Sequence, residues 1–200
     1  PLTVDPDYVN KLQDGKIDEI APCTRCMHCH FDYDTEGNIY EHCRVNACTQ
    51  RAYRDAMPEG FDLPELAAGP KNVLVVGGGP AGMEAARVAA LRGHNVTLAE
   101  KSGMLGGLLT FASAVKGPHE NLDDLNAYLQ KQLELAGVAV ELNCEVTADV
   151  VAQKAPDALV VAAGGVRDKL AVEGSDATPV VALDQFMFAG LEGKNVTIVG

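Results

Sequence analysis

Five of the six cysteines lie in the N-terminal quarter of the 200-residue chain, where their spacing indicates metal or redox chemistry. Two residues separate Cys23 from Cys26 and Cys26 from Cys29, and Cys43 follows after thirteen more. Three thiolates at this spacing can wrap one compact polyatomic centre and a distant fourth can complete it, as in a 4Fe–4S cluster. The sequence therefore predicts these four cysteines as the ligands of an iron–sulfur cluster.

Two alternatives stay open for this cysteine segment. Structural zinc more often takes two separated ligand pairs, but His28, His30 and His42 keep a mixed cysteine and histidine zinc site open. Free thiols are the other alternative, since the chain shows no secretory signal that would point to a disulfide framework. Cys48 is a second-choice ligand, and Cys144 is predicted to be an ordinary buried residue at the end of a strand.

A glycine-rich turn at 77–82, with the sequence GGGPAG, satisfies the dinucleotide-binding pattern G-x-G-x-x-G. In this pattern the first glycine permits a tight turn, the second lets the backbone approach a pyrophosphate, and the third lets the helix pack against the strand. Glu100 stands 18 residues beyond the last glycine, where a carboxylate can bind ribose hydroxyls. The residues expected to contact a dinucleotide here are Gly77, Gly79, Pro80, Ala81, Gly82 and Glu100.

The motif alone would suit NAD or FAD, and two further glycine runs favour FAD. The run GMLGG at 103–107 follows Glu100 closely, so backbone without bulky side chains can pass beside a long flavin nucleotide. The run AAGG at 162–165 ends a later strand, at the sheet edge where ligands of parallel sheets bind. These runs add Gly106, Gly107, Leu108, Ala163 and Gly164 to the predicted cofactor site.

The elements that must position these motifs alternate between strands and helices. Short apolar runs predict strands at 73–76, 95–99, 138–142 and 158–163. Helices are expected at 80–92, behind the glycine turn, and at 121–136, where leucines recur at helical spacing. The predicted fold class is therefore α/β: a doubly wound, Rossmann-like nucleotide-binding domain preceded by a small cysteine-rich segment.

Near the N-terminus, Pro6 permits a short helix with Asp5 as its N-cap and Gly15 just past its end. No other element is expected before the cysteines.

Composition and charge exclude several classes of protein. Apolar residues make up 47% of the chain and charged residues 22%, as in an ordinary globular protein. The net charge of -12 argues against non-specific binding to nucleic acid or to anionic membranes. No apolar run approaches the roughly 18 residues of a membrane helix, and no signal peptide is evident, so a cytoplasmic location is expected.

One internal repeat bears on the domain organisation. The sequence KNVLVVG at 71–77 returns as KNVTIVG at 194–200, at an offset of 123 residues. The last residue is thus the first glycine of an expected second nucleotide-binding turn, and we expect a longer polypeptide. The predicted parts are a segment at 1–20 that resembles the tail of an upstream domain, the cluster segment at 21–57, a linker at 58–70, the FAD- or ADP-binding domain at 71–192, and the start of a truncated domain at 193–200.

Together these motifs resemble the family of 2,4-dienoyl-CoA reductase and trimethylamine dehydrogenase, multidomain flavoproteins related to old yellow enzyme. The segments that carry the resemblance are APCTRCMHC with CRVN, VVGGGPAG through TLAEK with LGG, LNCEVT, and GKNVTIVG. The resemblance implies that residues 1–20 leave a (β/α)8 barrel, that residues 193–200 begin an NAD(P)H-binding domain, and that Lys101 and Val146 also contact the dinucleotide. Leu108 departs from the family pattern, in which glutamine is common.

The resemblance also implies an activity. Electrons would pass from NAD(P)H through FAD and the 4Fe–4S cluster to FMN in the barrel, for reduction of an activated C=C bond in a small enoate or enoyl substrate. Two points stay open: whether ADP takes the place of FAD, and whether the protein forms a homo-oligomer. The alternatives are an electron-transfer chain like the small subunit of glutamate synthase, which usually carries two sets of cluster cysteines, and a non-enzymatic module that binds zinc and ADP.

Overall fold

The computed structural model describes residues 2–31, 43–46, 66–165, 180–181 and 189–198. Contacts divide the chain into two units, 1–163 and 164–200, of which the first holds every helix and strand described below. In chain order these are α1 (Tyr8–Gln13), η1 (Ile17–Glu19), α2 (His28–Phe31), β1 (Asn72–Val76), α3 (Pro80–Leu91), β2 (Asn95–Ala99), α4 (Leu108–Lys116), η3 (Gly117–His119), α5 (Leu122–Leu135), β3 (Ala139–Glu141), α6 (Ala148–Lys154) and β4 (Ala158–Val161).

The centre of the first unit is a parallel sheet with the strand order β3-β2-β1-β4. Leu74 of the central strand β1 pairs in register with Thr97 of β2 and with Leu159 of β4. The apolar run predicted for β1 is buried from Val73 to Val75, as expected for a strand covered on both faces. The predicted α/β class with a parallel sheet is therefore confirmed.

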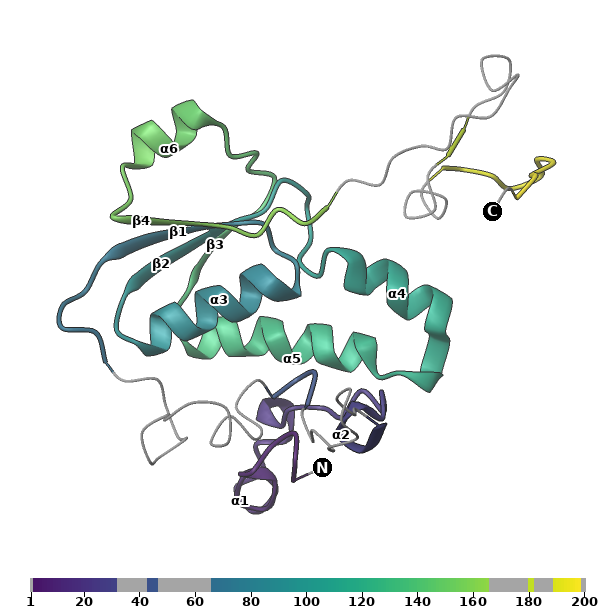
Figure 1. The fold of residues 1–200 in the computed structure, drawn as a ribbon, viewed down its shortest axis with the longest axis horizontal. Helices are drawn as coiled ribbons and strands as arrows, with labels where there is room; N and C mark the ends of the chain where they lie inside the picture. The colour runs from purple at the N-terminus through teal and green to yellow at the C-terminus, as the bar shows by residue number, and fades with distance from the viewer. Residues whose placement is uncertain (1, 32–42, 47–65, 166–179, 182–188, 199–200) are drawn as a thin grey trace, which may run out of the picture. The chain divides into compact units, whose positions relative to one another are not determined.

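Helices cover both faces of this sheet. Figure 1 shows α3 and α5 on one face and the short helix α6 on the other. The core lies between the sheet and the α3–α5 pair, because alternate strand residues point to that side. Its buried members are Val73, Val75, Met83, Ala86, Val96, Leu98, Leu129 and Leu133.

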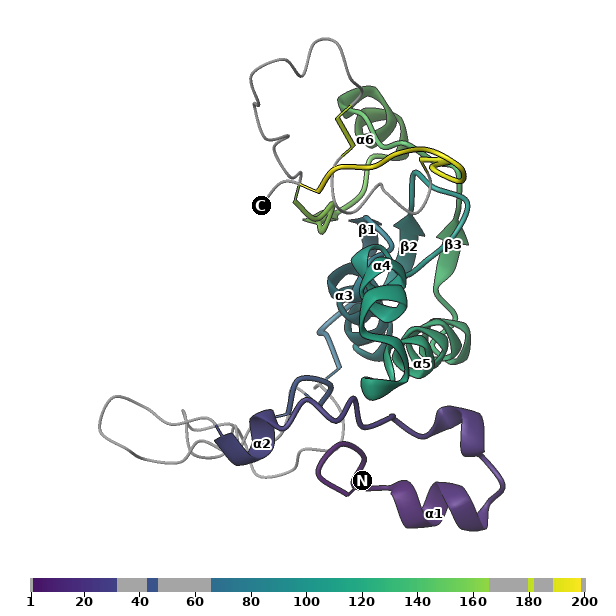
Figure 2. The same cartoon turned by 90° about the vertical axis from the view of Figure 1, so that its right-hand side faces the viewer.

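The described part of the N-terminal segment packs beneath α5 in both ribbon views (Figures 1 and 2). Asp5 organises this segment, because its buried carboxylate accepts hydrogen bonds from the backbone N–H groups of Asp7 at 3.0 Å and Ala21 at 2.8 Å. It also pairs with the ammonium group of Lys11 at 2.8 Å. The expectation that Asp5 caps the first helix is wrong: Asp7 occupies the N-cap position of α1, and Asp5 closes a longer loop instead.

The predicted elements match the structure closely within the sheet. The strand predicted at 95–99 and the helices predicted behind Gly79 and from 121 are present within a residue or so of the expected bounds. The third and fourth strands are shorter than expected. Helices α4 and α6 were not expected, and α4 follows directly on the second glycine run.

The second unit is described at residues 164–165, 180–181 and 189–198, which contain no helix or strand. Among all the residues that the structure describes, none belongs to a helix with the length and apolar character needed to span a membrane.

Candidate nucleotide and cluster sites

The glycine turn between β1 and α3 is as tight as the motif requires. Gly77 has a φ of 107°, a left-handed conformation that suits glycine, and its N–H donates to the carbonyl of Ala99 at 2.8 Å. A Cβ at Gly82 would lie 1.9 Å from the Gly77 carbonyl oxygen, so only glycine lets the helix approach the turn this closely. Gly79 differs, because a Cβ there would meet no atom nearer than the Gly107 Cα at 4.0 Å. The open space at Gly79 is where a phosphate group could approach the backbone.

Two helix N-termini meet at this glycine. Helix α3 begins at Pro80 with Gly79 as its N-cap, and α4 begins at Leu108 with Gly107 as its N-cap. The two cap glycines are in close contact, since a Cβ on Gly107 would lie 3.0 Å from the Gly79 Cα. Each helix N-terminus carries a partial positive charge, so their convergence favours a diphosphate.

The carboxylate of Glu100 is fixed at the end of β2. Its two oxygens accept hydrogen bonds from the N–H groups of Gly78 at 2.7 Å and Ser102 at 2.8 Å. Partial burial works to raise the pKa of Glu100, but these hydrogen bonds outweigh burial and hold the pKa below its ordinary value. The group is therefore ionised at neutral pH and held in one orientation, with acceptor lone pairs left for ribose hydroxyls.

A pocket of about 200 Å³ opens at the carboxyl ends of β1 and β2, the edge at which parallel sheets bind ligands. It brings together five of the predicted cofactor residues, Gly77, Glu100, Lys101, Val146 and Ala163. Pro80 and Ala81 lie in the first turn of α3, and Leu108 starts α4 with its side chain 47% exposed. Gly164 has a φ of 75° and belongs to the second unit.

Cys144 was predicted to be a buried core residue, and this is wrong. Its side chain is only partly buried and lines the pocket together with Glu145. Its backbone N–H donates to the carbonyl of Glu100 at 2.9 Å, which places the segment after β3 beside Glu100. One sequence signal could have placed Cys144 at the site: it stands two residues before Val146, a predicted contact of the dinucleotide, just after the end of the strand.

A buried polar atom beside the second glycine run has no hydrogen-bond partner. Within the described residues, the amide oxygen Oδ1 of Asn126 on α5 is buried and accepts no hydrogen bond. It lies beside Gly106, where a Cβ would be 2.9 Å from it, and Gly106 has a φ of 122°.

The cysteine loop has an unusual backbone. Arg25 and Met27, which flank Cys26, have φ values of 54° and 61°, a conformation uncommon in residues other than glycine. The N–H of Arg25 donates to the Sγ of Cys23 at 3.4 Å. Alternating left-handed residues turn N–H groups toward a common centre, as around many iron–sulfur clusters. The loop therefore fits a cluster whose sulfurs accept backbone hydrogen bonds.

A hydrogen bond links Arg44, the residue after the fourth predicted ligand Cys43, to the cysteine loop. Arg44 donates from Nη2 to the Nε2 of His28 at 2.6 Å, so His28 acts there as an acceptor. Cys26, Cys29 and Cys43 are partly buried and Cys23 is exposed, and no disulfide joins the described cysteines. No group of three or more His, Cys, Asp or Glu side chains within the described residues is arranged to hold a single metal ion. His30 has no described side chain, and His42 and Cys48 lie outside the described residues.

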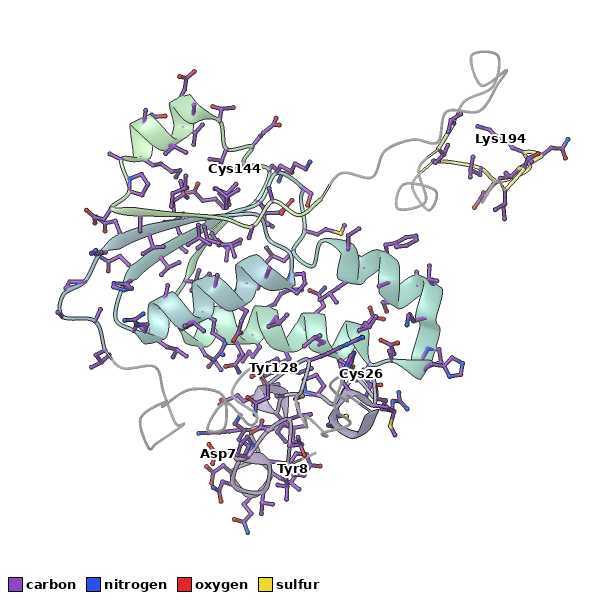
Figure 3. All side chains as sticks on the ribbon, in the orientation of Figure 1. Asp7, Tyr8, Cys26, Tyr128, Cys144 and Lys194 are labelled. Carbon is purple, nitrogen blue, oxygen red and sulfur yellow. The ribbon has the colours of Figure 1, made fainter. Side chains whose placement is uncertain are left out.

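The cysteine loop is hydrogen-bonded to the nucleotide-binding domain, which the sequence did not predict. The guanidinium group of Arg25 donates to the carbonyl of Pro118 at 2.6 Å and to the Oδ1 of Asn121. The Nδ2 of Asn121 in turn donates to the carbonyl of Cys23 at 3.0 Å. Figure 3 shows Cys26 beside the N-terminal end of α5.

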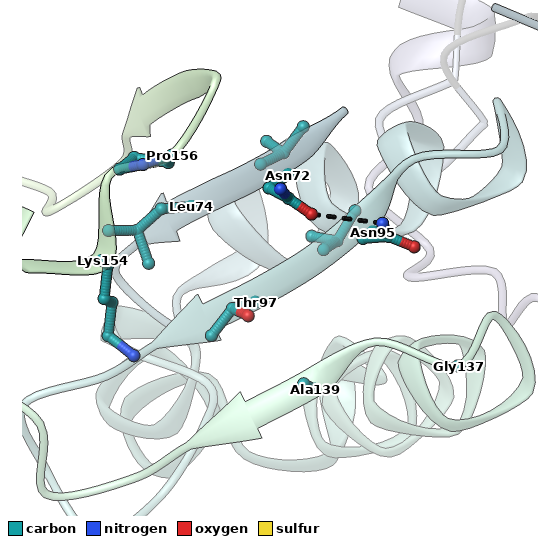
Figure 4. A pocket seen from close by; sticks show the side chains of 10 residues that line it. Asn72, Leu74, Asn95, Thr97, Gly137, Ala139, Lys154 and Pro156 are labelled. Atoms are coloured by element: carbon teal, nitrogen blue, oxygen red, sulfur yellow. Dashed lines mark hydrogen bonds between the residues drawn. The ribbon is translucent and has the colours of Figure 1, made fainter. Parts of the chain in front are cut away.

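A larger pocket of about 460 Å³ lies on the face of the sheet that carries α6 (Figure 4). Asn72 and Asn95 at its rim begin β1 and β2, and the Nδ2 of Asn95 donates to the Oδ1 of Asn72 at 3.2 Å. It therefore opens near the amino ends of these strands, away from the glycine turn, and contains none of the predicted cofactor residues.

The glycine turn and Glu100 form a candidate dinucleotide site, and the proteins that this chain resembles are flavoprotein oxidoreductases. Residues 72–155 match the family model described as FAD dependent oxidoreductase. Cinnamate reductase from Clostridium sporogenes is 33% identical over the whole of this chain, which covers 29% of that protein. N,N-dimethylglycine/sarcosine dehydrogenase from Chromohalobacter salexigens is 40% identical over 80% of this chain and 22% of its own length.

Among solved structures, a 2-naphthoyl-CoA reductase in complex with 2-naphthoyl-CoA matches with a TM-score of 0.79 and 35% identity, over 92% of this chain and 27% of that one. The chain belongs to the 2,4-dienoyl-CoA reductase and trimethylamine dehydrogenase family, related to old yellow enzyme. It spans less than a third of the length of these relatives.

Proposed function

We propose that this chain is the electron-relay portion of an NAD(P)H-dependent iron–sulfur flavoprotein that reduces an activated C=C bond of an enoate or enoyl substrate. The observation that carries the proposal is the contact between the cysteine loop and the nucleotide-binding domain through Arg25 and Asn121. A cluster and a dinucleotide would thereby be held in one unit, as an electron relay requires. The substrate site and FMN would belong to a barrel domain, and NAD(P)H to a further domain, of the same polypeptide.

The cofactors supply the redox chemistry: a flavin accepts a pair of electrons as hydride, and an iron–sulfur cluster passes electrons singly. The chain supplies binding and orientation. Gly77, Gly79 and Gly82 let the backbone approach the diphosphate, and Glu100 receives the ribose. Cys23, Cys26, Cys29 and Cys43 would hold the cluster. The proposal places the protein in the cytoplasm, where free thiols persist.

A second candidate function is amine oxidation by the same relay, with electrons flowing outward from the substrate. It is favoured by the 40% identity to the dimethylglycine/sarcosine dehydrogenase. The residues described here serve either direction, because both require a cluster and a nucleotide in the same unit.

The test is anaerobic purification of the full-length protein. We expect about four iron atoms per protomer, as one cluster of this type requires, together with FAD and FMN. Oxidation of NAD(P)H that depends on cinnamate would support the reductase, whereas reduction of the flavins by dimethylglycine would support the second candidate. A colourless protein with one zinc ion and ADP would overturn both, and two clusters per chain would favour the type of relay found in glutamate synthase.

A further inference from the structure

Helix α4 connects the two predicted cofactor sites. Its N-terminus lies at the nucleotide turn, since its cap Gly107 is in close contact with Gly79. Its C-terminus leads through η3 to Asn121, the N-cap of α5, to which the cysteine loop is hydrogen-bonded. A helix of nine residues is about 14 Å long at 1.5 Å per residue, so one short rigid element spans the distance.

The cysteine-loop end of α4 is fastened by hydrogen bonds that act in both directions. Arg25 donates to Pro118 and Asn121, and Asn121 donates back to the carbonyl of Cys23. Pro118 belongs to η3, and Asn121 stands two residues after His119, the last residue of η3. The hydrogen bonds therefore hold both ends of this short connection between α4 and α5. The contact therefore fixes the loop against the connection between α4 and α5.

Arg25 adopts a φ of 54°, which costs conformational energy for a residue with a side chain. A glycine would adopt this conformation without strain. The side chain of Arg25 thus has a role that offsets the strain, and the hydrogen bonds to Pro118 and Asn121 are the contacts it makes in the structure.

We infer that Arg25 and Asn121 are positioning residues that fasten the cysteine loop to the end of α4, and that this contact sets the distance for electron transfer between FAD and the cluster. The inference rests on the proposed function. Neither side chain is a predicted ligand of the cluster or of the nucleotide. Electrons delivered in a pair by NAD(P)H to a bound flavin would pass singly through the cluster to FMN, and Arg25 and Asn121 would only hold the cysteine loop at a fixed distance from the nucleotide site.

The test compares the full-length protein with Arg25→Gly, Asn121→Ala and the double variant, with Asn95→Ala as a matched control. Arg25→Gly removes the guanidinium and relieves the strain, and Asn121→Ala acts from outside the cysteine loop. Asn95 is an exposed asparagine at the amino end of β2. Anaerobic stopped-flow absorbance separates reduction of FAD by NAD(P)H from the later bleaching of the cluster.

We expect both single variants to keep wild-type iron and FAD contents and the wild-type rate of FAD reduction. Cluster reduction should slow, because the rate of electron transfer falls as the separation of donor and acceptor grows. The double variant should be no slower than either single variant, since both break the same contact. Amide hydrogen exchange in the peptides 21–31 and 117–125 should rise in the apoprotein as well as the holoprotein, while Asn95→Ala changes none of these quantities.

Two results would overturn the inference. One is cluster reduction at the wild-type rate in both single variants with full iron content. The other is loss of iron from Asn121→Ala, which would make the contact a support for cluster binding rather than a determinant of distance. A wild-type protein without iron or flavin would instead show that the proposed function fails, and the inference with it.

Discussion

The nucleotide-binding sheet and the N-terminal cysteine segment are held together by different means. The sheet and helices α3 and α5 enclose a core of buried aliphatic side chains that includes Val75, Met83 and Leu98. Within described residues 2–29, Val4 and Ala21 are the buried apolar side chains, and the segment depends on the carboxylate of Asp5 and on hydrogen bonds to its neighbours. The comparison teaches that hydrophobic burial specifies the first region, whereas polar contacts and the expected cluster specify the second.

The largest effect should follow from loss of a cluster ligand. Cys26→Ser in the full-length protein should lower iron content and slow NAD(P)H-driven reduction of the barrel flavin by at least about 100-fold, since changes to mere supporting residues of metal sites already cost about 10- to 100-fold. Hydrogen exchange should rise in the cysteine segment and stay unchanged in β1 and α3. Cys144→Ser is the control and should keep its iron. Loosening of the sheet in Cys26→Ser would contradict the distinction drawn between the two regions.

Substitution of two glycines in the same turn should separate folding from binding. Gly82→Ala places a Cβ 1.9 Å from the Gly77 carbonyl oxygen and should lower the free energy of unfolding by about 1–3 kcal/mol, as overpacking does. Gly79→Ala meets no atom nearer than 4.0 Å, so thermal stability should stay near that of the wild type. Its FAD affinity should fall by about tenfold, equivalent to about 1.4 kcal/mol. Equal thermal destabilisation by the two variants would show that Gly79 is required by the fold and not by the cofactor.

Removal of the Glu100 charge should have a smaller effect that depends on pH. Because the pKa of Glu100 is lowered in the folded protein, the carboxylate stabilises the fold above its ordinary pKa, and this contribution is lost as the pH falls through the lowered value. Glu100→Gln should cost about 1 kcal/mol at pH 7, through the weaker hydrogen bond to Gly78 or Ser102. Urea unfolding of the wild type and the variant between pH 3 and 7 should show the two stabilities converging at low pH. A difference in the free energy of unfolding that is constant between pH 3 and 7 would exclude the charge of Glu100 as its cause.

The smallest effect is expected at the exposed ion pair between Lys154 of α6 and Glu141 of β3, whose atoms lie 2.7 Å apart. The Lys154 partner lowers the pKa of Glu141, but both side chains are partly exposed to water. Lys154→Met should change the free energy of unfolding by less than about 1 kcal/mol, and added salt should reduce even that difference. A larger loss would mean that α6 contributes more to the sheet region than its short contact with the strand indicates.

The two regions also differ in how far their structure could be predicted from sequence. In the sheet region the apolar runs, the glycine turn and Glu100 each had one physical interpretation, and the strands, helix α3 and the edge that carries the pocket lie where expected. Helix α4 was not predicted, because the glycine run before it was interpreted only as backbone that can pass beside a nucleotide, and the apolar stretch after it was not assigned to any element. The surroundings of Asn126 were not predicted either, because Gly106 lies beside it in the fold but 20 residues away in the sequence.

In the cysteine segment, spacing alone suggested which side chains could bind a cluster but not how the loop would be held. The left-handed residues Arg25 and Met27 carry no sequence signal, because arginine and methionine seldom adopt this conformation. The contact between Arg25 and Asn121 joins residues 96 positions apart, and no periodic pattern links them. The assignment of the four cluster ligands stays a prediction that the iron analysis will test.

The reactivity of the partly buried thiol of Cys144 should report whether the nucleotide pocket is occupied. It lines the pocket beside Glu100 and takes part in no disulfide, so a nucleotide bound there should slow its reaction with a small alkylating reagent. Mass spectrometry of the labelled peptide would then count occupied sites without any optical signal.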